Sequence, residues 1–352
     1  MRDSAGIYIH FPFCKRKCFY CHFTKFTYEK ELVDKYLNYL VKEIHLRSNL
    51  NYKIDTIYLG GGSPSLLNEE QLSMIISAIY RYFNIENKAE ITIEANPEDL
   101  TYKKLNYIKK NGVNRLSIGI QSFVKKDLVY LKRNHSVKQS IKAVENALNA
   151  GFSNINLDFI IGLPAQTQKT LEYNFSKLKG FDISHVSAYI LEGIKKDKYS
   201  EERDNELYFF TKDLLEFIGY THYEVSNFSK KGFQSKHNLK YWQDKNYIGI
   251  GLSASSYENR IDHKNFSNFK DYFKKIENKK IPYNESKTIE HDKRRIITGL
   301  RMIDGISIEN FKNYKNALNF LISNNLLVKK KSKVAVNPYK ILVLNEILTF
   351  FL

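Results

Sequence analysis

The feature that most constrains the fold is a regular alternation of β-rich and helical segments between residue 6 and about residue 225. Expected strands cover residues 6–11, 55–62, 90–96, 115–122, 155–164 and 185–191. Expected helices cover residues 30–47, 68–83, about 99–110 and 136–151, with another before the last strand. In the first helix, Leu37, Leu40 and Ile44 fall on one face. Such alternation predicts a parallel sheet with right-handed crossovers.

Six strand–helix units are fewer than the eight that close a barrel. We therefore expect an α/β fold, a partial (β/α)6 barrel, with a doubly wound sheet as the alternative. In both folds, ligands bind at the C-terminal ends of the strands. The chemically suggestive residues fall there: three cysteines after the first strand, glycines after the second, then Glu94, Gln121 and Asp158.

The alternation ends near residue 225. Residues 236–257 look like an aromatic loop, and helices surround a basic turn from residue 288 onward. We expect two domains, a barrel over 1–225 and a small, mostly helical domain over 226–352 with a winged-helix-like end.

Cys14, Cys18 and Cys21 are the only cysteines, spaced C-x3-C-x2-C. Three thiolates can hold an iron–sulfur cluster and leave one iron without a protein ligand. Structural zinc needs four ligands, so it would require a histidine such as His10 or His22. The remaining interpretation is that the three cysteines are neighbours in the sequence and share no ligand. The odd number of cysteines and the lack of a signal peptide argue against disulfides, so we expect a cytoplasmic protein with reduced thiols.

The net charge is +17. Such charge suits nucleic acid or an anionic membrane, but scattered lysines are more typical of a solvated surface. We expect no nucleic-acid partner, while peripheral contact with anionic lipid stays open.

The cysteine spacing after a first strand, with YIHFPFC leading into it, resembles the radical S-adenosylmethionine (SAM) superfamily. Within it, the chain is similar to the oxygen-independent coproporphyrinogen III oxidases and the radical-SAM heme chaperones. The resemblance implies a [4Fe–4S] cluster on the three cysteines, whose fourth iron binds the amino and carboxylate groups of SAM.

The resemblance also implies a set of SAM-binding residues. They are Tyr8, Gly61, Gly62, Ser63, Glu94, Gln121, Arg133 and Asp158. Ser63 stands where the family usually has threonine, and it keeps the hydroxyl. Asp158 lies in an apolar strand, and a buried carboxylate needs a partner or a ligand.

Two departures argue against the oxidases: Phe23 replaces their fourth cysteine, and Cys14 lies close to the first residue, which leaves no room for their N-terminal segment. Residues 237–242 resemble the HNxxYW motif of the heme chaperones. His237 would then ligate heme iron, and Tyr241 and Trp242 would stack on the macrocycle. The alternative is a packed aromatic turn with a hydrogen-bonded histidine.

The resemblance thus predicts a heme chaperone that binds a cluster, SAM and heme, and passes heme to an acceptor apoprotein such as a membrane respiratory enzyme. Whether it cleaves SAM stays open. Coproporphyrinogen oxidation, another SAM-radical reaction and nucleic-acid modification remain as alternatives.

Overall fold

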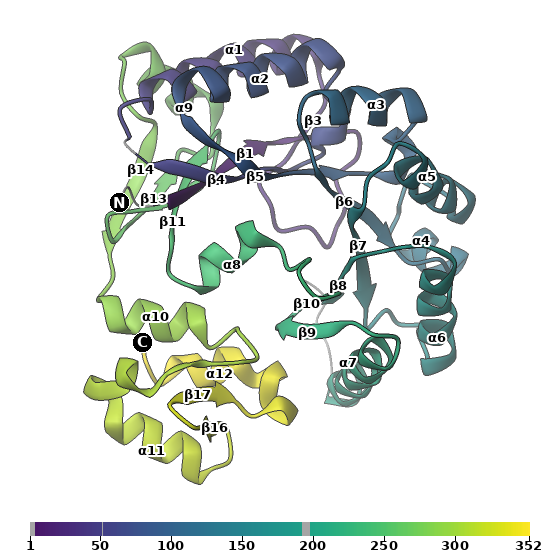
Figure 1. Cartoon of the computed structure of the whole chain (residues 1–352), viewed down its shortest axis with the longest axis vertical. Helices are drawn as coiled ribbons and strands as arrows, with labels where there is room; N and C mark the ends of the chain where they lie inside the picture. The colour runs from purple at the N-terminus through teal and green to yellow at the C-terminus, as the bar shows by residue number, and fades with distance from the viewer. Residues whose placement is uncertain (1–3, 51, 192–197) are drawn as a thin grey trace.

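The computed structural model describes residues 4–50, 52–191 and 198–352. Its centre is a parallel sheet of six neighbouring strands, as the alternation predicts, and the helices that connect them cover its outer face (Figure 1). In spatial order the strands are β1 (Ser4–Phe11), β4 (Lys53–Gly61), β5 (Asn84–Ala95), β6 (Arg115–Gln121), β7 (Asn154–Ile161) and β8 (His185–Ile190).

The connecting helices follow the predicted positions closely. They are α1 (Lys30–Leu46), α2 (Glu69–Tyr82), α3 (Tyr102–Lys110), α4 (Lys125–Tyr130), α5 (Val137–Asn149), α6 (Gln168–Ser176) and α7 (Lys198–Phe217), with the short turns η1 (Pro64–Leu66), η2 (Pro97–Asp99) and η3 (Lys177–Gly180). Capping boxes at Asn68, Ser136 and Thr167 start three of them. The expected α/β fold with a partial barrel is confirmed.

Both edges of this sheet are extended by further strands, all of them antiparallel to their neighbours except β11, which runs parallel to β1. Beyond β8 lie β10 (Asn227–Ser229) and β9 (Thr221–Glu224). Beyond β1 lie β11 (Asn246–Ile250), β12 (Ser255–Glu258), β13 (Ile261–Asn265) and β14 (Tyr283–Thr288). The helix α9 (Phe269–Glu277) connects β13 to β14. We call β11–β14 the strand extension.

The expectation of an aromatic loop over residues 236–257 is wrong. This segment forms α8 (Lys236–Trp242), β11 and β12. β11 runs parallel to β1, with Ala5 opposite Asn246 and Ile9 opposite Ile250. In β11, the run of apolar and glycine residues is four residues long, which is too short to predict a strand by itself. The strand forms because the open edge of β1 supplies its hydrogen-bonding partner. The sheet therefore crosses residue 225, and the two-domain division there stays a prediction.

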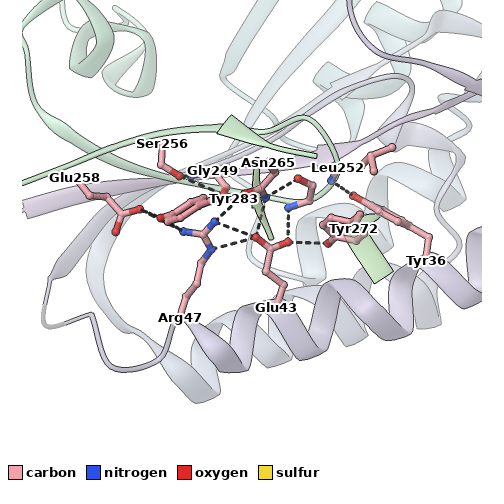
Figure 2. A network of polar contacts seen from close by, with 11 residues as sticks. Tyr36, Glu43, Arg47, Gly249, Leu252, Ser256, Glu258, Asn265, Tyr272 and Tyr283 are labelled. Carbon is pink, nitrogen blue, oxygen red and sulfur yellow. Dashed lines mark hydrogen bonds and ion pairs between the residues drawn. The ribbon is translucent and has the colours of Figure 1, made fainter. Parts of the chain in front are cut away.

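A buried polar network joins the strand extension to α1 (Figure 2). The side chains of Glu43 and Arg47 are fully buried and form an ion pair of 3.0 Å. Arg47 also contacts Glu258 at 3.2 Å and the Tyr283 hydroxyl at 2.8 Å. Buried charges are costly unless further hydrogen bonds compensate them, and here each charge has several.

The C-terminal part contains α10 (His291–Gly299), η4 (Ile308–Tyr314), α11 (Lys315–Ser323), η5 (Pro338–Val343) and α12 (Leu344–Thr349). A small antiparallel sheet orders its strands as β15 (Ile306–Ser307), β17 (Lys333–Val336) and β16 (Leu327–Lys330). Figure 1 shows this part below the sheet, with α8 between the two. Among the described residues, no helix combines the length and hydropathy that crossing a bilayer requires.

Candidate cofactor site

A cavity of about 840 Å³ opens at the C-terminal ends of the parallel strands, where the fold predicts a ligand site. Its walls come from the cysteine loop, from the ends of β4–β8, from α7 and from the C-terminal η5 and α12. Nine predicted site residues line it: Cys14, Cys18, Cys21, Gly62, Ser63, Glu94, Gln121, Arg133 and Asp158.

The cysteine loop is held by short backbone contacts between β1 and α1. The two-residue strands β2 (Phe13–Cys14) and β3 (Phe26–Thr27) pair in parallel and close the loop. The amide of Cys21 donates to the carbonyl of Cys18 at 3.3 Å. All three thiols are free and half-buried. Burial raises the pKa of Cys14, the hydrogen bond from Ser63 lowers it, and the nearby charges of Cys21 and Cys18 raise it further.

Two cavity side chains donate hydrogen bonds to the sulfur atoms. The hydroxyl of Ser63 lies 3.5 Å from Cys14 Sγ, and the guanidinium of Arg133 lies 3.8 Å from Cys18 Sγ. Asn96 joins these two donors, because its Nδ2 is 2.8 Å from Ser63 Oγ and its Oδ1 is 2.6 Å from Arg133. Donors aimed at sulfur stabilise thiolates, and such bonds tune iron–sulfur clusters.

The donor set therefore fits an iron–sulfur cluster held by three thiolates. In the described part of the chain, no group of three or more histidine, cysteine or acidic residues is arranged to hold a single metal ion. Both ring nitrogens of His10 already have partners, the hydroxyl of Tyr8 at 3.0 Å and the carbonyl of Thr24 at 3.1 Å. Nothing in this geometry supports His10 as the fourth ligand of a zinc site.

The glycines after β4 let the cysteine loop cross the strand end. A Cβ at Gly62 would lie 2.6 Å from the carbonyl oxygen of Phe13, and Gly61 has φ +105 with the His10 ring beside it. The backbone amides of Gly62 and Ser63 instead donate to Phe11 and Phe13, each at 2.8 Å. The glycines thus serve close backbone approach, which only residues without a Cβ permit.

Two half-buried carboxyl groups, Glu94 and Asp158, face the cavity. Glu94 accepts hydrogen bonds from the Tyr58 hydroxyl at 2.9 Å and from the Gly61 amide at 3.1 Å. Burial and the charge of Asp158 raise the pKa of Glu94 to about 7. Asp158 accepts from Ser117 at 3.1 Å and from Asn156 at 2.8 Å, and burial raises its pKa too. A cationic ligand in the cavity would favour the ionised form of both groups.

Gln121 lies at the end of β6 with φ +67, a left-handed conformation that is uncommon outside glycine. The register between β6 and β7 is irregular between Ile118 and Gln121. The bend directs this part of the strand end toward the cavity, where Gln121 is a lining residue.

Three predicted residues are not among those that line the cavity. Gly61 supports Glu94 through its amide, and Tyr8 bonds His10. His237 is fully buried under the sheet. Its Nδ1 is 2.8 Å from the Thr56 hydroxyl, and its Nε2 is 2.9 Å from the Tyr241 hydroxyl.

The surroundings of His237 are those of a packed aromatic cluster. Its ring lies against that of Tyr58 with centroids 5.2 Å apart, and Gly6 leaves room for it, since a Cβ there would lie 2.9 Å from Nδ1. Burial lowers the pKa of His237 to about 3. The structure therefore separates the histidine of the HNxxYW segment from the cavity.

Comparisons with known proteins agree with this architecture. Residues 8–177 match the model of the radical SAM superfamily. The heme chaperone HemW of Bacillus subtilis is 34% identical, with 98% of this chain and 98% of that protein covered. The heme chaperone HemW of Lactococcus lactis is 33% identical, with 95% and 93% covered. The chain belongs to the HemW family.

A solved structure shares the fold of this HemW-family chain from end to end. The coproporphyrinogen III oxidase HemN of Escherichia coli superposes with a TM-score of 0.86, covering 99% of this chain and 90% of that one, at 21% identity. At this identity the likeness shows the fold alone.

Sequence reasoning missed several residues of the site. They are Tyr20, Tyr58, Asn96, Ser117 and Arg301, all of which line the cavity. Asn96 lies two residues after Glu94 and directly before a proline at the strand end. This position is the signal from which the sequence analysis could have predicted it as a site residue. Nothing in the sequence pattern signals Arg301, because the fold brings it to the cavity from the C-terminal part.

Proposed function

We propose that this protein is a heme chaperone that binds a [4Fe–4S] cluster, SAM and heme, and that passes heme to an acceptor apoprotein. The observation that carries the proposal is the cavity itself. It gathers three free thiols, two of which accept hydrogen bonds at sulfur, and two half-buried carboxyl groups, in a chain of the HemW family.

Each part of the cavity has a proposed role. Cys14, Cys18 and Cys21 would hold the cluster, and Ser63 and Arg133 would orient two of the sulfurs. Glu94, Gln121 and Asp158, together with the backbone of Gly62, would contact SAM. When bound, the cluster supplies an iron with an open position and one-electron chemistry. The two carboxylates favour a cationic ligand electrostatically, and the cavity walls limit its contact with water.

Gly61 and Tyr8 would act through other residues. Gly61 orients the Glu94 carboxylate by its amide, and Tyr8 orients His10, whose other nitrogen bonds the Thr24 carbonyl near Cys21. His237 stays the heme ligand that the family motif suggests. Ligation there would require α8 to move, because both ring nitrogens are engaged and the ring is fully buried.

The proposed setting is the cytoplasm, where thiols stay reduced. The acceptor would be an apoprotein such as a membrane respiratory enzyme, and the net charge of +17 would favour transient contact with anionic lipid. No nucleic-acid partner is proposed.

The test is anaerobic reconstitution with iron and sulfide, followed by titration with hemin. We expect about four iron and four sulfide per chain in the wild type, and saturable heme binding. Cys18→Ala should lose the visible absorbance of the cluster and retain its heme binding. Zinc in place of iron, or iron without sulfide, would refute the cluster. Conversion of coproporphyrinogen III to protoporphyrinogen IX would instead identify an oxidase.

A further inference from the structure

We propose that Asn96 is a positioning residue that holds the two side-chain donors of the cysteine sulfurs in place, and that it thereby sets the reduction potential of the cluster. This inference rests on the cluster of the proposed function and is independent of where heme binds. Asn96 acts through Ser63 and Arg133, which contact the two ends of its amide group.

The backbone of Asn96 is fixed at the end of β5. Its amide donates to the Ser65 hydroxyl at 3.2 Å, and its carbonyl accepts from the Asp99 amide at 3.1 Å. Pro97 follows and favours the extended conformation that Asn96 adopts, with φ −94 and ψ 143. The side chain therefore enters the cavity from the strand end in a defined direction.

Arg133 determines which way the amide group of Asn96 is turned. A guanidinium only donates hydrogen bonds, so the atom that faces it must be the amide oxygen, and Oδ1 lies 2.6 Å from Arg133 Nη2. Nη2 also donates to the Gly119 carbonyl at 3.2 Å, while Nη1 contacts the Tyr20 hydroxyl at 3.3 Å and Cys18 Sγ at 3.8 Å. The bond to Asn96 is the shortest of these four, so its loss should shift the guanidinium relative to the sulfur.

The other end of the amide directs the proton of Ser63. With Oδ1 toward Arg133, Asn96 presents Nδ2 to Ser63 Oγ at 2.8 Å, and the hydroxyl must accept from it. A hydroxyl has a single proton, which is then left for Cys14 Sγ at 3.5 Å. In the described part of the chain, that sulfur is the one acceptor found for the Ser63 hydroxyl.

Both donors act on the charge of the cluster. Reduction adds an electron, and hydrogen bonds to the sulfur atoms stabilise the more negative state. At Cys21 Sγ, no hydrogen-bond donor is found among the described residues, so the bonds to Cys14 and Cys18 are the two that Asn96 controls. Removing the Asn96 side chain should therefore make the cluster harder to reduce.

The experiment is an anaerobic redox titration of the cluster-loaded, full-length protein, with dithionite as the electron donor and visible absorbance as the readout. Asn96→Ala should lower the equilibrium constant for reduction about tenfold, which is about 59 mV for a one-electron couple. The effect is this large because two hydrogen bonds to charged sulfur weaken together. Iron and sulfide contents should match the wild type, because Asn96 is not a cluster ligand.

A second background tests whether Asn96 acts through its neighbours. Ser63→Ala removes one donor directly, so in that background Asn96→Ala should lower the equilibrium constant only about threefold, since it then affects Arg133 alone. A residue that merely supported the fold would have the same effect in both backgrounds. Ser63→Thr keeps the hydroxyl and should keep the wild-type potential.

Two further variants complete the comparison. Asn319→Ala removes the same group at an exposed position of α11 and should titrate like the wild type. Asn96→Asp keeps the shape and the acceptor for Arg133 but cannot donate to Ser63. It should lower the potential at least as much as Asn96→Ala, and it decides the question if the alanine variant does not hold its cluster.

The outcomes separate the role of Asn96 from the proposed function. A wild-type potential in Asn96→Ala or Asn96→Asp, with the cluster in place, would overturn the inference. An equal effect of Asn96→Ala with and without the Ser63 hydroxyl would also overturn it. A wild-type protein that holds no [4Fe–4S] cluster after reconstitution would instead refute the cluster of the proposed function.

Discussion

The carboxyl group of Glu94 shows how a single half-buried residue can make ligand binding depend on pH. Its pKa is raised from 4.5 to about 7, first by burial and then by the charge of Asp158, while Tyr58, the Gly61 amide and Arg115 act in the opposite direction. The folded protein therefore keeps a proton that the unfolded chain releases above its ordinary pKa. This group's contribution to stability falls as the pH rises from about 4.5 to 7.

Ligand binding should follow the opposite trend. SAM is cationic at its sulfonium, so ionised Glu94 favours it, and the wild-type affinity for SAM should rise between pH 6 and 8. Glu94→Gln should bind SAM about tenfold more weakly at pH 8 and show a flatter profile. Calorimetric titration at several pH values would measure this. An unchanged slope in the variant would assign the pH dependence to another group, Asp158 first.

At the scale of elements, the turn after β11 supports the cysteine loop from outside the barrel. The Thr24 hydroxyl donates to Ser253 at 2.9 Å, and Thr24 lies three residues after Cys21. The Tyr36 hydroxyl of α1 donates to the His10 carbonyl at 2.6 Å and accepts from the Leu252 amide at 3.1 Å. The strand extension thus positions both ends of the loop that would hold the cluster.

Removing the Thr24 hydroxyl should loosen the loop without unfolding the protein. One hydrogen bond contributes about 1 kcal/mol, so Thr24→Val should release cluster iron to a chelator about fivefold faster. Thr24→Ser should restore the wild-type rate. Thr27→Val is the matched control, because Thr27 is an exposed residue of β3. Equal rates in Thr24→Val and the wild type would mean that the contact with Ser253 does not hold the loop.

At the scale of the molecule, the network around Glu43 keeps the C-terminal strands on the barrel. One carboxylate oxygen accepts from the Gly251 amide at 2.8 Å and the Tyr272 hydroxyl at 2.7 Å, and the other from Asn265 at 2.9 Å (Figure 2). Arg47 depends on this carboxylate, since both are fully buried. The network therefore links α1 with strands more than two hundred positions later in the sequence.

Breaking this pair should destabilise the whole chain. Glu43→Ala leaves a buried guanidinium with less compensation, and we expect a loss of about 3–5 kcal/mol in unfolding free energy. Amide exchange should rise in β12 and β13 first. Glu86→Ala is the control, because the Lys53–Glu86 pair is largely exposed and should contribute at most about 1 kcal/mol. Equal losses in the two variants would refute the role of the network.

The sequence alone determined the six-stranded core and the candidate ligands. Strand–helix alternation is a local pattern, and parallel strands bring their C-terminal ends to one edge. That is why Cys14, Glu94 and Asp158, far apart in the chain, line one cavity as expected. The resemblance in the cysteine motif added the family, which the comparisons confirm.

Only the tertiary structure decided how the C-terminal third is used. β11 exists because β1 offers a free edge, which no local propensity reveals. Arg301 and Val343 reach the cavity because α10 and η5 pack beside the barrel, a contact between distant segments. His237 is buried because α8 packs against β1 and β4, which is also a contact between distant segments. The HNxxYW motif gives the types of residue in α8, but this packing decides which hydrogen-bonding partners their side chains have.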